Sequence, residues 1–145
     1  MANNNNPIVV EQFFPVSSAK LWQAITVVDE MTQWFFENIP DFKAEKGFYT
    51  EFPIHSEGRI FTHEWTILEV IPEKKIVYDW RYPEYSGIAR IDFELIEENN
   101  GTTLRLSNYG LDSFPKEIPE FSEESCRGGW NYFIKERLKD YLNKL

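Results

Sequence analysis

The sequence predicts an α+β fold in which a curved antiparallel sheet of about six strands wraps around a long C-terminal helix. Apolar side chains alternate every second residue through most of 47–109, whereas 119–145 has the three-to-four spacing of a helix. A helix with one wide apolar face needs a concave apolar partner, and a curved sheet supplies one. Residues 8–145 are therefore expected to form a single domain, with the polar residues 1–7 as a disordered leader.

The composition favours a globular protein and argues against two classes of partner. The 145 residues include five Trp, seven Tyr and twelve Phe, enough to line a dense core, a cavity, or both. The net charge of −9 disfavours nucleic acid and anionic membranes, both of which select clustered Lys and Arg. A single cysteine, Cys126, rules out an internal disulfide and fits a reducing compartment. With no signal peptide pattern and no transmembrane run, we expect a cytoplasmic protein.

The N-terminal part predicts one strand and two short helices. Ile8–Phe14 is β-branched and aromatic, hence a strand, and Pro15 ends it. Ser17 or Ser18 is placed to cap a helix that continues to residue 28. A second helical piece is expected over residues 29–38, before Pro40.

The middle of the chain predicts an antiparallel meander of five strands. Asn99, Asn100 and Gly101 form a strong hairpin turn, because Asn and Gly tolerate positive φ. In most strands one face is apolar and the other polar, but residues 58–71 carry apolar side chains in both registers, so the buried face there stays open. The expected strands are 47–53, 58–71, 75–82, 87–97 and 102–109.

The C-terminal helix carries the features that bear on function. Projected at about 100° per residue, its large apolar side chains share one face, and Glu123 and Arg127 fall within the same arc. Gly128 and Gly129 cost roughly 1 kcal/mol each relative to Ala in a helix interior. We expect this loss of helix stability to be offset by a structural role of the glycines. Either Gly129 allows a close approach to a neighbouring element, or the pair marks a bend over a cavity.

The ordered set of elements and several short motifs resemble the START-like (SRPBCC) superfamily with its helix-grip fold. Within it, the chain is similar to the family named after the activator of the heat-shock chaperone ATPase. The motifs are PVSSAKLWQAIT after the first strand, Gln33-Trp34-Phe35, Glu69-Val70-Ile71-Pro72 before KKIVYDW, Gly101-Thr102 with Leu104 and Leu106, and Gly129-Trp130. Members often have a histidine where this chain has Cys126. The co-chaperone has a further N-terminal domain, for which we expect no room ahead of Ile8.

The resemblance implies a cavity between the sheet and the terminal helix that holds a hydrophobic or amphipathic small molecule. Arg127 either meets an anionic head group of that ligand or pairs with Glu123 or a sheet carboxylate, and both alternatives stay open. The candidate cavity residues are Trp65, Tyr78, Trp80, Phe93, Glu123, Arg127 and Trp130.

Three functions are compatible with the sequence. The leading hypothesis is a small-molecule-binding domain, and the first alternative is a module that interacts with a chaperone. The second alternative, a cyclase- or hydrolase-type enzyme, lacks a recognisable acid–base set, so a non-enzymatic role is favoured. The two histidines, His55 and His63, have no metal-ligand spacing, and no Gly-rich phosphate loop follows a strand, so neither a metal nor a cofactor is predicted.

Overall fold

A computed structural model describes residues 7–144 and contains one six-stranded antiparallel sheet. The strand order across the sheet is β1-β6-β5-β4-β3-β2, so the first strand pairs with the last and every other pair is a hairpin neighbour. The leader predicted for residues 1–7 lies, apart from Pro7, outside the described residues. The strands are β1 (Ile8–Phe14), β2 (Tyr49–Ser56), β3 (Arg59–Ile71), β4 (Lys75–Tyr82), β5 (Tyr85–Glu98) and β6 (Gly101–Tyr109).

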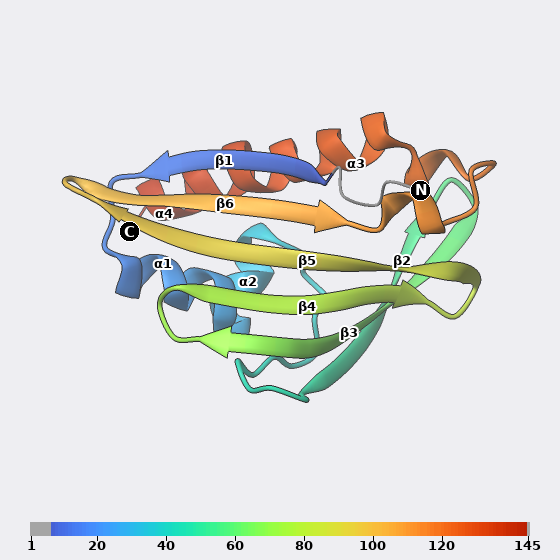
Figure 1. Cartoon of the computed structure of the whole chain (residues 1–145), viewed down its shortest axis with the longest axis horizontal. Helices are drawn as coiled ribbons and strands as arrows, with labels where there is room; N and C mark the ends of the chain where they lie inside the picture. Colours follow the sequence, from blue (N-terminus) through green and yellow to red (C-terminus); the bar gives the residue numbers. More distant parts are fainter. Residues whose placement is uncertain (1–6, 145) are drawn as a thin grey trace.

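The helices occur in two groups, as expected. Figure 1 shows the C-terminal rod running along β1 and β6, with α1 and α2 near the end of the sheet where α4 lies. The rod is continuous but changes winding in its middle third, which is π-helical. The first group is α1 (Ser18–Thr26) and α2 (Val28–Trp34); the rod is α3 (Glu123–Trp130), η3 (Asn131–Leu138) and α4 (Lys139–Asn143). None of the helices within residues 7–144 is long and apolar enough to cross a membrane.

The predicted helix over residues 29–38 is too long. The structure ends α2 at Trp34, and Phe35 leaves helical geometry with φ −100° and ψ −129°. Adjacent residues of a helix point about 100° apart, so in a continued helix the rings of Trp34, Phe35 and Phe36 would span about 200° and could not all face inward. The break lets the rings of Phe35 and Phe36 both face the interior, where they pack against each other at a centroid distance of 4.8 Å.

The core lies between the concave face of the sheet and the helices. The side chains of Phe61, His63, Trp65 and Ile67 in β3 are buried, so this is the face of the strand that packs on the core. The sequence had left the buried face of this strand undecided. A register shift between Ile67 and Glu69 then changes the alternation. Irregularity of this kind is typical of a β-bulge, and after it Val70, from the other register, packs against the core.

Both free edges of the sheet make contacts to side chains from outside it. At the β2 edge, Asn38 Nδ2 donates to the carbonyl oxygen of Pro53 at 2.7 Å. At the β1 edge, Lys135 Nζ of the terminal rod donates to the carbonyl oxygen of Glu11 at 2.8 Å.

On the polar face, Asp79 and Asp92 are buried and pair with Arg81 and Arg90 at 3.2 and 3.0 Å. The negative charge of each of these carboxylates is therefore paired with an arginine of the sheet. Neither carboxylate pairs with Arg127 of the terminal helix, which was one of the alternatives for that residue.

Candidate functional site

A cavity of about 350 Å³ lies between the sheet and the first half of the terminal rod. Strands β2 to β6 supply one wall, α3 and the start of η3 supply the other, and the chain between β6 and α3 closes the end. Its volume is at the lower end of the usual range for small-molecule pockets. Eight of the eighteen lining residues are aromatic: Phe36, Phe61, Trp80, Tyr82, Phe114, Phe121, Trp130 and Phe133.

Strand alternation brings the polar lining residues to this wall. His63 has the same orientation as Phe61 and Trp65, two residues away on either side in β3. Asn108 follows the inward-facing Leu104 and Leu106 of β6 in the same way. The sheet thus places a histidine and an amide among aromatic rings.

His63 is held as a neutral imidazole with a defined tautomer. Its Nδ1 lies 3.0 Å from the carbonyl oxygen of Phe61, and a carbonyl only accepts, so Nδ1 carries the proton. Burial lowers the pKa of His63 from 6.5 to about 4. At neutral pH the other nitrogen, Nε2, therefore has a free lone pair.

We expect this buried histidine to make the fold sensitive to acid. Above pH 6.5 neither the folded nor the unfolded state binds a proton at His63. Between pH 6.5 and about 4 the unfolded chain protonates first, so stability falls as pH falls, by up to about 3 kcal/mol, and levels off below. Urea unfolding of wild type and His63→Phe between pH 7 and pH 5 measures this. The variant is expected to lose most of the slope, and equal slopes would contradict the assignment of the depressed pKa to His63.

Two further polar atoms of the cavity wall have no hydrogen-bond partner among the described residues. They are Nε1 of Trp80, a donor, and Oδ1 of Asn108, an acceptor. Both side chains line the cavity, and buried polar groups in proteins are nearly always paired. Each of the two atoms exposes less than 1 Å² of surface, so both lie behind the open face of the wall.

Two other titratable groups of the cavity, Cys126 and Tyr82, are also uncharged at neutral pH. Burial raises the pKa of the Cys126 thiol to about 11, and burial raises the pKa of Tyr82 as well. Cys126 Sγ contacts the carbonyl oxygen of Glu120 at 3.6 Å. A thiol with a raised pKa is a poor nucleophile, because the thiolate is the reactive form.

Glu120 is the one charged residue in the lining, and it is already paired. Its carboxylate accepts hydrogen bonds from Arg59 at 3.1 and 3.2 Å and from Ser56 Oγ at 2.9 Å. The pKa of Glu120 is held below its usual value: burial raises it, but the hydrogen bond from Ser56 and the charge of Arg59 lower it by more. This pair joins the β2–β3 hairpin to the turn η2 (Pro119–Phe121) at the rim of the cavity.

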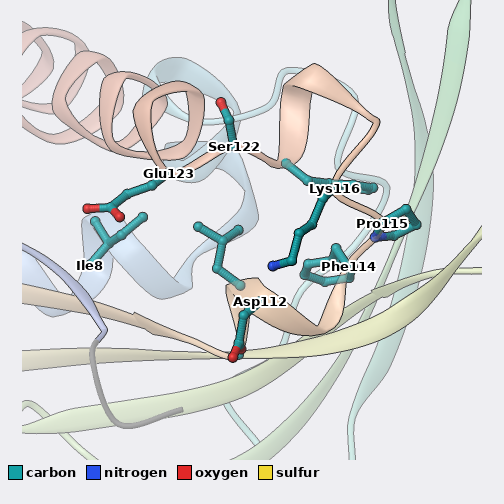
Figure 2. Close-up of a pocket in the computed structure, with 10 residues that line it drawn as sticks. Ile8, Asp112, Phe114, Pro115, Lys116, Ser122 and Glu123 are labelled. Carbon is teal, nitrogen blue, oxygen red and sulfur yellow. The ribbon is translucent and has the colours of Figure 1, made fainter. Parts of the chain in front are cut away.

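An outer pocket of about 400 Å³ adjoins the inner cavity. Figure 2 shows it, with Lys116 and Phe114 on one side and Ile8 and Glu123 on the other. Leu111, Phe114 and Phe121 line both spaces and so form the wall between them. Phe114 and Phe121 stack at a centroid distance of 4.7 Å.

The structure separates the predicted cavity residues into three groups. Trp80 and Trp130 line the cavity. Trp65, Tyr78 and Phe93 are fully buried in the core beside it and are not part of its lining.

Glu123 and Arg127 form the third group and lie outside the inner cavity. Arg127 is exposed and donates to Glu123 at 3.1 Å, so of the two alternatives for Arg127 the structure shows the ion pair. Glu123 borders the outer pocket only.

The polar residues of the cavity were not predicted from the sequence. The sequence predicts no role for His63, although its two-residue spacing from Trp65 links the orientation of both side chains. Asn108 was detectable in the same way from Leu106. Gly129, expected either to allow a close approach or to mark a bend, has no atom outside its own helix segment within 4 Å of the position its Cβ would take, and it lines the cavity.

Comparison with protein-family models gives one match, to the Activator of Hsp90 ATPase homolog 1-like proteins (AHSA1), over residues 15–143. The chain belongs to this family. Its START-like helix-grip fold is therefore established by both the AHSA1 model and the architecture described above. No curated protein matches the sequence.

Solved structures share the AHSA1-family fold over nearly the whole chain. Protein MLL2253 from Mesorhizobium loti is 26% identical, with a TM-score of 0.75 and coverage of 96% of this chain and 98% of its own. Protein CV1439 from Chromobacterium violaceum is 18% identical, with a TM-score of 0.77 and coverage of 93% and 95%. DynU16, a protein of the dynemicin biosynthetic locus, is 20% identical with a TM-score of 0.74; 96% of this chain matches 48% of DynU16.

Proposed function

We propose that this AHSA1-family protein binds an uncharged, largely apolar small molecule in the cavity between its sheet and α3. The observation that carries the proposal is the cavity of about 350 Å³, lined in large part by aromatic rings, with the imidazole of His63 in its wall. Burial of apolar ligand surface provides affinity, and a few placed polar groups provide orientation.

The charge of the lining argues for an uncharged ligand. No Lys or Arg is among the lining residues, and the carboxylate of Glu120 is already paired with Arg59. His63, Tyr82 and Cys126 are uncharged at neutral pH. An ionised ligand would leave water without a counter-charge, which is costly in an apolar site.

Ligand titration tests the proposal directly. Trp80 and Trp130 line the cavity, so their fluorescence is expected to change when a neutral bicyclic probe such as naphthalene binds. The carboxylate analogue, 2-naphthoate, is expected to bind at least tenfold more weakly. Native mass spectrometry of freshly purified protein would identify a retained natural ligand. The proposal is wrong if neutral probes neither change the fluorescence nor raise the unfolding temperature.

The hypothesis of a chaperone-interacting module stays a prediction. The AHSA1 family name refers to a chaperone activator, and co-purification with a chaperone is the measurement that would support this role. An enzymatic role would need two titratable groups in reach of each other. Within the described residues, no hydrogen bond joins His63 to Cys126 or Glu120, which favours binding over catalysis.

A further inference from the structure

We infer that the ligand carries a hydroxyl group that donates a hydrogen bond to Nε2 of His63. This inference rests on the proposed binding function and specifies the chemical class of the ligand: a neutral apolar molecule with an alcohol or phenol. The geometry around His63 determines which kind of polar group it selects.

The first step is the fixed tautomer of the ring. Because Nδ1 donates to the carbonyl oxygen of Phe61 at 3.0 Å, Nε2 is an acceptor and not a donor. No protein group in the described residues donates to Nε2. A ligand group that meets this nitrogen must therefore supply the proton.

The second step is the rigidity of the ring. His63 stacks on Phe52 with a centroid distance of 5.3 Å and an interplanar angle of 12°. Tyr82 lies nearly perpendicular to it at 4.9 Å, and Phe36 contacts it at 4.9 Å. Packing on several sides fixes the direction of the lone pair, and a fixed acceptor discriminates between ligands better than a mobile one.

The third step is the type of donor. An ammonium or other cation would have to leave water for a neutral site, and a carboxylate oxygen would place its own lone pairs against Nε2. A neutral hydroxyl avoids both problems.

The test compares two probes of almost equal shape, 2-naphthol and 2-methoxynaphthalene, by isothermal titration calorimetry at pH 7. The wild type is expected to bind the naphthol about five- to tenfold more tightly, the usual effect of one neutral hydrogen bond. In His63→Phe, which keeps an aromatic ring but removes the acceptor, this preference is expected to disappear. Equal affinities of the two probes for the wild type would overturn the inference while leaving the proposed function intact. Failure of both probes to bind would overturn the proposed function itself.

A second measurement needs no substitution and so does not depend on the variant folding. The chain has two histidines, and His55 is exposed, which makes it an internal reference for NMR of the ring nitrogens. Binding of 2-naphthol is expected to shift the Nε2 resonance of His63 toward that of a hydrogen-bonded nitrogen. 2-Methoxynaphthalene is expected to leave it nearly unchanged. If the naphthol binds and the resonance does not move, His63 is not its partner.

Discussion

Replacing Gly129 with leucine is expected to weaken ligand binding by at least about tenfold without harming the fold. Gly129 lines the cavity, and no atom lies within 4 Å of the position of a Cβ added there. A leucine would place four carbon atoms where the ligand is proposed to lie. The ligand could then bind only if the surrounding side chains repacked, which is costly. Because glycine is a poor helix former, the same change is expected to stabilise α3 by about 0.5–1 kcal/mol.

Gly128→Leu is the matched control, one residue earlier in the same helix. Gly128 is exposed, has open space around its Cβ position and does not line the cavity. Both variants should gain helix stability in urea unfolding, but only Gly129→Leu should lose affinity for naphthalene. If both variants bind as wild type does, the ligand lies elsewhere. If both lose binding, the effect comes from the helix and not from filling the cavity.

Phe35→Ala is expected to lower the free energy of unfolding by about 3–5 kcal/mol, the usual cost of removing a buried aromatic ring. The Phe35 ring stacks on Trp34 at 4.7 Å and meets Phe133 edge-on at 5.0 Å. It also packs against Trp65 from β3 and Trp130 from α3. One ring therefore joins the α2 region, the sheet and the terminal rod.

Urea unfolding measures this loss, and Phe13→Ala is the control. Phe13 is 39% exposed, so its truncation is expected to cost less than about 1 kcal/mol. Domains of this size are typically stable by 5–15 kcal/mol, so the Phe35 variant should be close to unfolding at elevated temperature. A cost below about 1 kcal/mol for Phe35→Ala would mean that the aromatic cluster is not the centre of the core.

Local sequence signals were sufficient for most of the fold. The bounds of β1 and β4 were predicted to the residue, because Pro15 and the Pro72-Glu73-Lys74 turn interrupt clear strand patterns beside them. Ser17 caps α1 through a 3.1 Å bond from the amide of Lys20, one of the two predicted possibilities. Where prediction was wrong, at Phe35 and Phe36, tertiary packing of two adjacent rings overrode local helix propensity.

The cavity was only partly predictable because a strand pattern gives the face of a residue but not its depth. Trp65 and Trp80 pair across β3 and β4 and both point inward. Only Trp80 reaches the cavity, whereas Trp65 is covered on all sides by other rings. Which of two inward rings borders an open space depends on side chains from other elements, here Phe35, Phe42 and Phe52.

The prediction that Arg127 lies on the inner, apolar face of the terminal helix was wrong for a geometric reason. The buried residues Trp130, Ile134, Leu138 and Leu142 are four apart, and in an α-helix each such step drifts by about 40°. A strictly α-helical projection therefore moves the apparent apolar face toward Arg127. The wider winding of η3 opposes this drift, so the buried face stays near Trp130. The cavity side, with Cys126, Gly129 and Phe133, lies on the other side of Trp130.

The two contacts at the sheet edges have a consequence for self-association. An open edge strand offers unpaired main-chain groups to which a second chain can add, and this is a common start of aggregation. In β2 the carbonyl of Pro53 is occupied by Asn38, and proline has no N–H to offer. In β1 the carbonyl of Glu11 is occupied by Lys135. Both edges are thus blocked near their midpoints, so growth of the sheet by strand addition is disfavoured even though the chain is rich in aromatic strands.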